Sequence, residues 1–577
     1  MRYLKNFILA LVMSTAVGTL FAQEQEGIDR TQVITGDRTL TVDKAFKITE
    51  SPTEVPVPSR SVDTVYTLLP KRPAVTVTAD PISPARIKVR EPLDPMYQGY
   101  VAGGAGTFQA PFLEAMYTST RKRDLSYGVK YRHLSANRGI RNVAFSGFSQ
   151  NELAAWGKKI FRKHSIESKA SFNRDVYHYY GFDPQDTDIA KGDIRQRFEL
   201  FSLNNKWKSY YSDSSKVNHD IDLNVYNLND RRGAGEFGIF AGGELHAFRG
   251  DQFYTMRTGL DIISYSSDGV APFAYMPANG EALPAETDAR TANGILYAVP
   301  QILLRKGNLS AAVGMGIYLQ VENTGRFHAF PDAEVSYSLF DNILVPYAGI
   351  TGSVNRVGYR TLTTANPWVL NSLDVQNSVT KYNVFGGIKG TVSDEVSFNA
   401  RVSYIQTDNM PLFVNDIIFS TENRFNVLYD NIGTFSMLGE MTYALNEKWG
   451  ATASVELLSY DTDREAQAWH LPSHRISLGG TYNLFDKLTA GLTLTWIGTR
   501  QAKSLLPVPG TEVLPEAEFI PVELDAYLDL SLSAEYRYTA RLSAFVEAHN
   551  LAGANYDIYY RFPAQRLFVL GGARYLF

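Results

Sequence analysis

The final segment of the chain, residues 567–577, constrains the fold more than any other part, because its side chains alternate in character with a period of two. One face, counted back from the carboxyl terminus, consists of Phe577, Tyr575, Ala573, Gly571, Val569 and Leu567. The opposite face carries Arg574, a charge that does not suit a lipid-facing position. An alternating strand that ends on an aromatic residue is typical of the closing strand of an outer-membrane β-barrel. We therefore interpret Tyr575 and Phe577 as a barrel-closing signal for the outer-membrane assembly machinery.

The composition alone would hide such a fold. The chain has 577 residues, no cysteine and a formal net charge of -4, and its mean hydropathy is -0.19. Beyond residue 22 no apolar run reaches the length of about 18 residues that a membrane-spanning helix needs. A barrel strand escapes this test because only alternate residues face lipid. The 34 Tyr, 32 Phe and 44 Gly suit aromatic girdles and close strand packing.

Several classes of protein are excluded by the same numbers. Without cysteine, the chain has neither a lipidated N-terminal cysteine nor a disulfide framework. The near-neutral charge gives no argument for a nucleic-acid partner. The expected partner is instead the lipid of the outer membrane.

The first 96 residues differ from the rest. Residues 1–22 read as a signal peptide, with Arg2 and Lys5 before an apolar centre and Ala22 at a plausible cleavage end. An N-terminal membrane anchor is the alternative, but the apolar run is short for one. Residues 23–96 are rich in proline and alternate little, so we expect a periplasmic extension or vestigial plug, mostly extended. This places the exported protein in the outer membrane of a Gram-negative cell.

Residues 97–577 repeat one pattern, in which alternating segments are joined in turn by tight turns and by longer polar connections. The predicted turns are 118–124, 162–164, 249–251, 306–308, 340–342, 393–395, 446–448, 485–487 and 537–539. The predicted longer connections are 181–193, 268–293, 362–378, 410–426, 463–473 and 502–521. Short turns on one side and long loops on the other are the layout of an outer-membrane barrel. The predicted fold is all-β, a transmembrane antiparallel barrel of about 22 strands with an even strand number.

The end of the barrel resembles that of a TonB-dependent outer-membrane receptor. The matching features are the strand around Phe545, the pair Asn550-Leu551, Tyr556, Arg566 and the end Tyr575-Leu576-Phe577. The beginning resembles the family in the segments 99–106, 112–117 and 126–131. The resemblance covers residues 97–577 and implies uptake of a nutrient. It departs from the family before the barrel, where members carry a folded plug of well over a hundred residues.

One short segment of the extension resembles the box through which the family contacts TonB. It consists of Ala74, Val75, Thr76, Val77, Thr78 and Ala79. An exposed extended strand of this kind can add to the edge of a partner's sheet. The alternative is an ordinary Val/Thr run of a secreted protein. The resemblance thus implies TonB, or another periplasmic or outer-membrane protein, as a partner.

Charged residues also recur on the predicted lumen face. The lumen-facing charges that we predict are Glu334, Lys389, Arg401, Glu440, Glu456, Asp529, Glu535, Glu547 and Arg574, with Asp220, Asp222 and Asp261 beside them. They could line a hydrated path or grip a plug. We favour cross-strand pairing, which keeps a polar wall satisfied.

We predict no catalytic residue, no metal site and no cofactor. His470 and His474 lie in a predicted loop near Asp461 and Asp463, but loop histidines are ordinarily solvated. No Gly-x-Ser-x-Gly elbow, glycine-rich phosphate loop or paired-cysteine site occurs. The loops 268–293 and 502–521 combine aromatic residues with proline and glycine, which suits either an external ligand or packing over the barrel mouth.

Three functions remain open at this point. The first is energy-coupled uptake of a nutrient too large for ordinary porins. The second is a structural or assembly barrel whose lumen is closed by a partner or by residues 23–96. The third is a passive channel, and an enzymatic barrel comes last.

Overall fold

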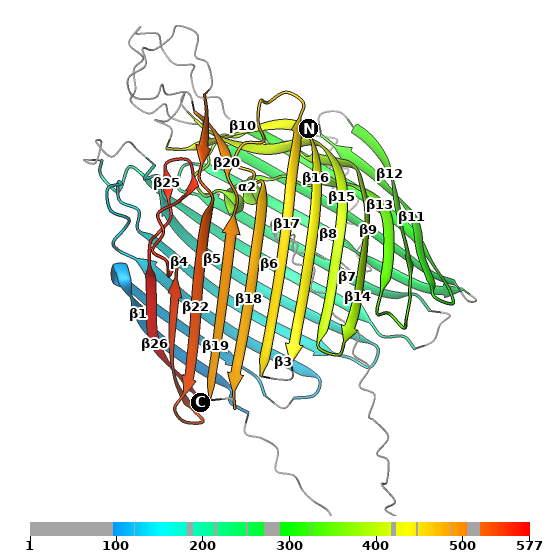
Figure 1. The fold of residues 1–577 in the computed structure, drawn as a ribbon, viewed down its shortest axis with the longest axis horizontal. Coiled ribbons are helices and arrows are strands. Elements are labelled where there is room, and N and C mark those ends of the chain that lie inside the picture. The colour runs from blue at the N-terminus through cyan, green and yellow to red at the C-terminus, as the bar shows by residue number, and fades with distance from the viewer. Residues whose placement is uncertain are drawn as a thin grey trace, which may run out of the picture. The chain divides into compact units, whose positions relative to one another are not determined.

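One sheet of 22 strands forms the wall of the protein (Figure 1). In this computed structural model, the first strand, β1 (Gly99–Gly106), pairs with β2 (Ala110–Thr118) on one side and with the last strand, β26 (Phe568–Leu576), on the other. The sheet therefore closes on itself. All its neighbouring strands are antiparallel. The predicted all-β antiparallel barrel of about 22 strands is confirmed.

The structure describes residues 96–577 except 121, 182–188, 213–215, 250–251, 270–288, 323–324, 417–422, 446–447, 486 and 505–519. The predicted signal peptide, the extension up to residue 95 and the box-like segment 74–79 lie outside the described residues.

The other wall strands follow one another around the barrel in chain order. They are β3 (Leu125–Ala136), β4 (Phe148–Ile160), β5 (His164–His178), β6 (Arg195–Ser209), β7 (Asn218–Asp230), β8 (Ala234–Arg249), β9 (Gln252–Ser267), β10 (Ala289–Lys306), β11 (Leu309–Val321), β12 (Gly325–Tyr337), β13 (Val345–Asn355), β14 (Ser378–Ser393), β15 (Val396–Asn415), β16 (Phe425–Leu445), β17 (Trp449–Thr462), β18 (His474–Leu484), β19 (Leu488–Ile497), β22 (Tyr527–Arg537) and β23 (Leu542–His549). Many are longer than ten residues, which is the length that a tilted membrane strand needs.

The two ends of the barrel differ in their connections. All nine predicted tight turns join strands at one end, where Gly99 also hydrogen-bonds to Phe577. The opposite end carries the longer connections, one of which includes a helix, α2 (Tyr359–Ala365). The three-residue 3-10 turn η1 (Thr107–Gln109), which joins β1 to β2, lies at the same end. Two small hairpins also lie there, β20 (Arg500–Ser504) with β21 (Ile520–Leu524), and β24 (Asp557–Tyr559) with β25 (Phe562–Pro563).

Three predicted connections are shorter than we expected, because strands continue into them. The range 410–426 is the clearest case, since β15 runs to Asn415 and β16 begins at Phe425. Pro411 and its neighbours pair with β16 in regular register. In the same way, β10 begins at Ala289, and β20 and β21 occupy both ends of the range 502–521.

The outward face of the wall is apolar. Large apolar side chains such as Leu153, Val313, Leu492 and Val546 are exposed at alternate positions along their strands. Exposed aromatic residues gather at the short-turn end: Tyr117, Tyr127, Phe161, Tyr210, Phe248, Tyr337, Phe340, Trp449, Phe485, Tyr536, Tyr538, Tyr575 and Phe577. An apolar band bordered by an aromatic girdle is what a barrel presents to lipid and to the membrane interface. Among the described residues, no helix is long and apolar enough to cross a membrane.

The centre of the seam between β1 and β26 is made of small residues, whereas Tyr100 and Val101 pair with Leu576 and Tyr575 at its short-turn end. Gly104 pairs with Gly572, and Ala105 pairs with Gly571. A Cβ atom on Gly104 would lie 2.6 Å from the Gly571 carbonyl oxygen, so the close approach of the two backbones requires glycine. At this centre the closing strands are thus held chiefly by their backbone hydrogen bonds.

Candidate functional site

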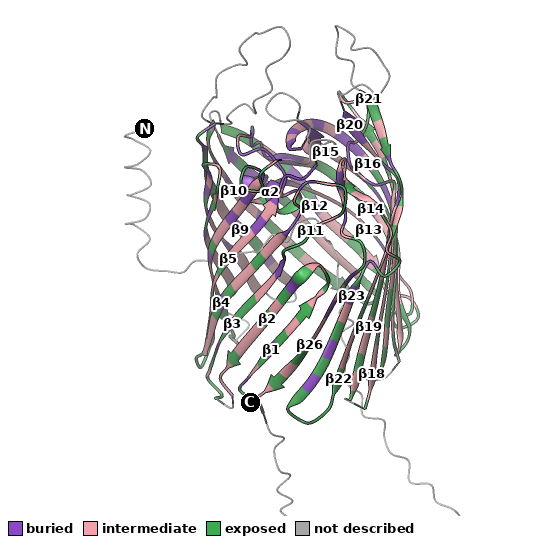
Figure 2. Cartoon of the chain, turned by 90° about the vertical axis from the view of Figure 1, so that its left-hand side faces the viewer, coloured by how far each residue is buried: buried purple, intermediate pink, exposed green. Residues whose placement is uncertain are grey.

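A long connection between β13 and β14 is the most distinctive feature of the long-loop end. It consists of residues 356–377, includes α2, and is called the strap below. Both views draw α2 within the outline of the barrel toward that end (Figures 1 and 2). In Figure 2, buried residues gather at the same end of the wall.

The strap reaches the wall at β8 and β9. Asn371 Nδ2 donates to the carbonyl oxygens of Arg232 and Gly269, each at 2.8 Å. The Tyr265 hydroxyl of β9 donates to the Asn371 carbonyl oxygen. Arg232 lies in the turn between β7 and β8, so the strap is tied to a part of the wall several strands away from its own ends.

The strap also pairs with β16 on the other side. Val369 forms a parallel bridge with Phe425, where the Leu370 N–H donates to the Phe425 carbonyl at 2.8 Å. The Phe425 N–H donates to the Trp368 carbonyl at 3.0 Å. Because β8 and β16 are far apart in the sheet order, a segment bonded to both must cross the space that the barrel encloses.

Two carboxylates of the wall hold the beginning of α2. Glu236 of β8 accepts hydrogen bonds from the backbone N–H groups of Tyr359 and Arg360 and from the Tyr226 hydroxyl. Asp230 of β7 accepts the Tyr359 hydroxyl at 2.9 Å. Burial raises the pKa of Tyr359 well above its ordinary value, so this hydroxyl stays a donor. Hydrogen bonds to charged acceptors are the stronger kind in proteins, and these fix the helix to the wall.

A third carboxylate anchors the start of the strap. Arg356 pairs with Asp261 of β9, with 2.6 Å between Nη1 and Oδ1. Arg356 is buried, so the pair lies largely away from water. Asp261 was predicted as a lumen-face charge, but its partner on the strap was not predicted.

Aromatic packing fills the space around the middle of the strap. Trp368 packs against Phe562 of β25 in a tilted arrangement, with ring centroids 4.4 Å apart, and meets Tyr180 edge-on at 5.7 Å. The Trp368 indole N–H donates to the His178 carbonyl oxygen at 3.0 Å. Strap residues Val357, Tyr359, Leu362, Trp368, Val369, Leu370, Leu373 and Val375 share one buried cluster with residues of β6, β7, β8, β9 and β16. The long-loop end therefore contains a packed core, which is unusual for a set of loops.

The neighbouring loop 463–473 adds a buried histidine to this core. His470 packs on Tyr559 at 5.1 Å and on Phe425 at 5.7 Å, and its backbone N–H donates to the Gln501 carbonyl. Burial, with a smaller contribution from the Arg500 charge, lowers the pKa of His470 to about 3. The expectation that this loop histidine is solvated is wrong, because the loop folds down onto aromatic residues.

Several of the predicted lumen charges pair across strands. Arg574 meets Glu535 at 2.6 Å and Lys389 meets Glu334 at 3.6 Å, so two pairs form within the predicted set. Glu456 pairs with Arg475 at 3.7 Å.

The other predicted charges have different neighbours. Glu440 accepts from Asn399 at 3.0 Å, and Asp529 accepts the Tyr556 hydroxyl at 2.8 Å. Glu547 lies 4.0 Å from His549. The Arg401 guanidinium lies over the Phe385 ring, at 4.1 Å from its centroid. The structure therefore does not gather the predicted charges into one site.

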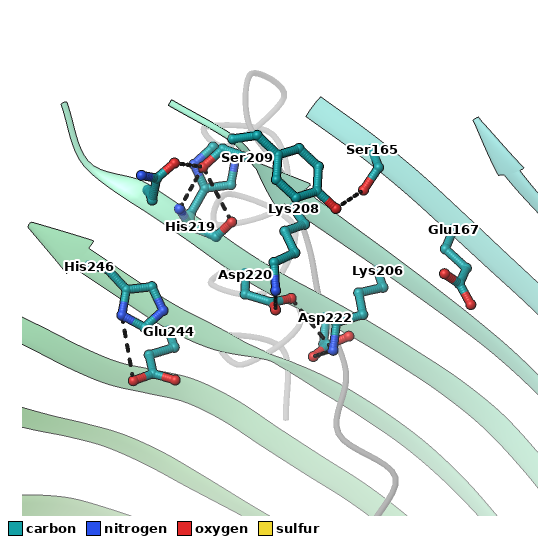
Figure 3. A network of polar contacts seen from close by, with 12 residues as sticks. Ser165, Glu167, Lys206, Lys208, Ser209, His219, Asp220, Asp222, Glu244 and His246 are labelled. Atoms are coloured by element: carbon teal, nitrogen blue, oxygen red, sulfur yellow. Dashed lines mark hydrogen bonds and ion pairs between the residues drawn. The ribbon is translucent and has the colours of Figure 1, made fainter. Parts of the chain in front are cut away.

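A denser polar network lies on β6 and β7 (Figure 3). Lys206 meets Asp220 at 3.5 Å and Asp222 at 3.4 Å, and Lys208 meets Asp220 at 3.0 Å. The two aspartates were predicted, but their lysine partners were not. The lysine side chains are about half exposed, so each pair contributes roughly 0–1 kcal/mol. The network pairs the charged side chains of the wall with one another and does not form a ligand site.

The described residues contain no group of three or more His, Cys, Asp or Glu side chains that could hold a metal ion. The strap itself was missed by sequence reasoning, which treated residues 362–378 as a polar connection. The available signal was the density of apolar residues from Trp368 to Val375. A solvated loop would not carry so many.

No protein-family model matches the chain, and a comparison with curated proteins gives no match. Solved structures do match. The FrpB iron transporter from Neisseria meningitidis aligns with a TM-score of 0.63 at 9% identity, over 84% of this chain and 82% of that one. The fold is that of an outer-membrane receptor barrel.

Two further structures agree. The ferripyoverdine receptor of the outer membrane of Pseudomonas aeruginosa has a TM-score of 0.59 at 14% identity, over 83% of this chain and 72% of that one. The ferric-catecholate import receptor Fiu from E. coli K12 has a TM-score of 0.58 at 10% identity, over 83% of this chain and 82% of that one. The resemblance to TonB-dependent receptors is thus confirmed for the barrel fold. The matched proteins are transporters and receptors, which fits a barrel that is not an enzyme.

Proposed function

We propose that this protein is an integral outer-membrane barrel that takes up a nutrient too large for ordinary porins. The observation that carries the proposal is the closed wall of 22 strands, which has the fold of outer-membrane iron receptors and transporters. A barrel of this strand number encloses a lumen much wider than that of a small barrel. Ferric chelates are the first substrate class to test, because the matched receptors are named for them.

The apolar outward face supports the orientation that we propose. The aromatic girdle at the short-turn end lies at the periplasmic interface, and the strap and long loops face the exterior. The opposite face of the wall, which carries the pairs Glu535–Arg574 and Glu334–Lys389, lines the lumen. In this proposal residues 1–22 direct export and are then removed.

Coupling to TonB is the finer part of the proposal. Residues 74–79 would act as an extended strand that adds to the edge of the periplasmic partner's sheet. We would delete residues 74–79 in cells that depend on this protein and measure uptake of a radiolabelled ferric chelate. Uptake should be lost, whereas deletion of residues 60–65, of equal length, should leave it intact. Unchanged uptake after the first deletion, with normal amounts of folded barrel, contradicts the coupling.

A structural or assembly subunit is the second candidate, and one feature of the wall favours it. The wall from β16 to β23 has a shallow groove lined mostly by glycine and hydroxyl side chains: Thr442, Gly450, Thr452, Gly479, Gly480, Thr481, Gly491, Thr493, Ser531 and Ser533. Such a surface leaves room for another polypeptide. Purification in mild detergent separates the candidates, because a stoichiometric partner favours the assembly role and a lone barrel opposes it.

A further inference from the structure

We propose that the strap is a gate that closes the long-loop end of this barrel, and that Glu236 and Asp230 of the wall are its latch. This goes beyond uptake, because the closure does not depend on which solute passes or on whether TonB acts. It assigns to the barrel's own segment 356–377 a role that needs no separate plug at this end.

The attachment of the strap to the chain permits it to move as one unit. The strap begins after Asn355 and ends before Ser378, and these two residues are direct partners in the pairing of β13 with β14. A segment whose two ends lie side by side can leave its binding place without disturbing the sheet that carries it. Apart from the two peptide bonds that join it to Asn355 and Ser378, every contact that holds the strap across the lumen is non-covalent.

The charged acceptors that oppose opening lie at the start of α2, and the contacts of Trp368 and Asn371 add to them. Glu236 is almost fully buried and is satisfied by two backbone N–H groups and the Tyr226 hydroxyl. Gly358 lets the strap backbone approach this carboxylate, since a Cβ there would lie 2.7 Å from Glu236 Oε2. When the strap leaves, Glu236 loses two of these donors and must be resolvated. Leaving this buried carboxylate without two of its donors is costly. The strap is therefore expected to be either fully bound or fully released.

Neighbouring charges reinforce the latch. Asp230 binds the Tyr359 hydroxyl and is also held by the Gln196 amide at 2.8 Å, so it keeps a partner when the strap leaves. Asp261 holds Arg356, the first residue of the strap. The three carboxylates lie on β7, β8 and β9, so the latch occupies one side of the wall. The later part of the strap contacts β16 through the backbone hydrogen bonds of the Val369–Phe425 bridge. The Tyr429 hydroxyl of β16 adds two bonds there, because it accepts from the Gln376 N–H at 3.1 Å and donates to the Asp374 carbonyl at 2.9 Å.

The experiment measures access to the lumen from outside the cell. The chain has no cysteine, so Thr493→Cys gives a single thiol on β19, in the wall groove. Thr493 pairs with Ser531 and therefore lies on the same face of the wall as the predicted lumen charge Asp529. Intact cells would be treated with a 5-kDa polyethylene-glycol maleimide, which is too large for ordinary porins. Ala466→Cys, at an exposed position of the loop 463–473, gives the labelling rate of a freely accessible thiol.

With the strap closed, Thr493→Cys should react at least tenfold more slowly than Ala466→Cys. Replacing residues 359–375 by a short Gly-Ser linker should raise its rate to that of the control. Combining Glu236→Gln with Asp230→Asn should raise the labelling rate of Thr493→Cys roughly tenfold or more, because hydrogen bonds to charged acceptors are lost. The two kinds of variant are independent, so failure of the linker variant to fold leaves the latch variant as the test.

Two results overturn the gate. One is equal labelling of Thr493→Cys and Ala466→Cys when the strap is intact. The other is labelling that stays slow in folded variants without the strap or without the latch, with folding checked by heat-modifiable migration in gels. Loss of nutrient uptake plays no part in this readout, so failure of the gate and failure of the uptake proposal are distinguishable.

Discussion

Replacing Trp368 by alanine tests how firmly the strap is held. Trp368 is 8% exposed, packs against Phe562 with ring centroids 4.4 Å apart and donates to the His178 carbonyl at 3.0 Å. Truncation of a buried Trp costs about 3–5 kcal/mol. At about 1.4 kcal/mol per tenfold change, the strap should open roughly a hundred to a few thousand times more often.

Hydrogen exchange measures that opening directly. The N–H groups of Leu370 and Phe425 bond across the junction of strap and β16, so their protection reports strap release. Trp368→Phe is the matched control, because it keeps an aromatic ring and loses the indole hydrogen bond, worth about 0.5–1.5 kcal/mol. Its protection should fall by roughly tenfold at most. Equal protection in the wild type and Trp368→Ala, or an equal loss in both variants, would refute this account of the strap.

Three further predictions concern the wall, a loop and the seam. A double-mutant cycle of Glu535→Ala and Arg574→Ala, measured by urea unfolding in detergent, should give a coupling of about 1 kcal/mol or less, because both side chains are about a third exposed; a coupling of several kcal/mol would contradict a hydrated wall. His470 is neutral in the fold, with a pKa of about 3, whereas an exposed histidine binds a proton below about pH 6.5. As the pH drops below about 6.5, the free energy of unfolding should therefore decrease by up to roughly 1.4 kcal/mol per pH unit. The melting temperature of His470→Phe should decrease less steeply over the same range, and parallel pH profiles of the two proteins would argue against this. Gly104→Ala should destabilise the barrel by about 1–3 kcal/mol, because its Cβ meets the Gly571 carbonyl, whereas Gly103→Ala has open space; equal urea midpoints for the two variants would count against a tight seam.

The wall was predictable because its signal is local. Alternation along a strand such as β19 predicts which residues face lipid. Leu492 and Trp496, which it places on the lipid face, are exposed. The range 410–426 misled the prediction because Pro411 and Asn415 are turn residues by composition, yet the alternating Leu412 and Val414 continue β15. Here pairing with β16 outweighed local propensity.

The strap could not be predicted, because its partners are remote in sequence. Glu236 and Tyr359 are separated by 123 residues, and Tyr179 donates to the Val369 carbonyl across 190 residues. No periodic pattern encodes such contacts. Lys206 and Lys208 are close in sequence to Asp220, and recognising them as its partners required the register in which β6 pairs with β7.

The glycine-rich junction of β1 and β26 has a consequence for biogenesis. These two strands are the most distant in sequence of all neighbours in the wall, so their contact has the greatest loop-closure cost and forms late. At the centre of the junction, small side chains on both edges offer little cross-strand packing to hold the strands together before the backbone bonds form. Before it closes, the barrel would therefore present two unpaired strand edges. A strand of the insertion machinery can pair with such an edge until the pairing of β1 with β26 displaces it.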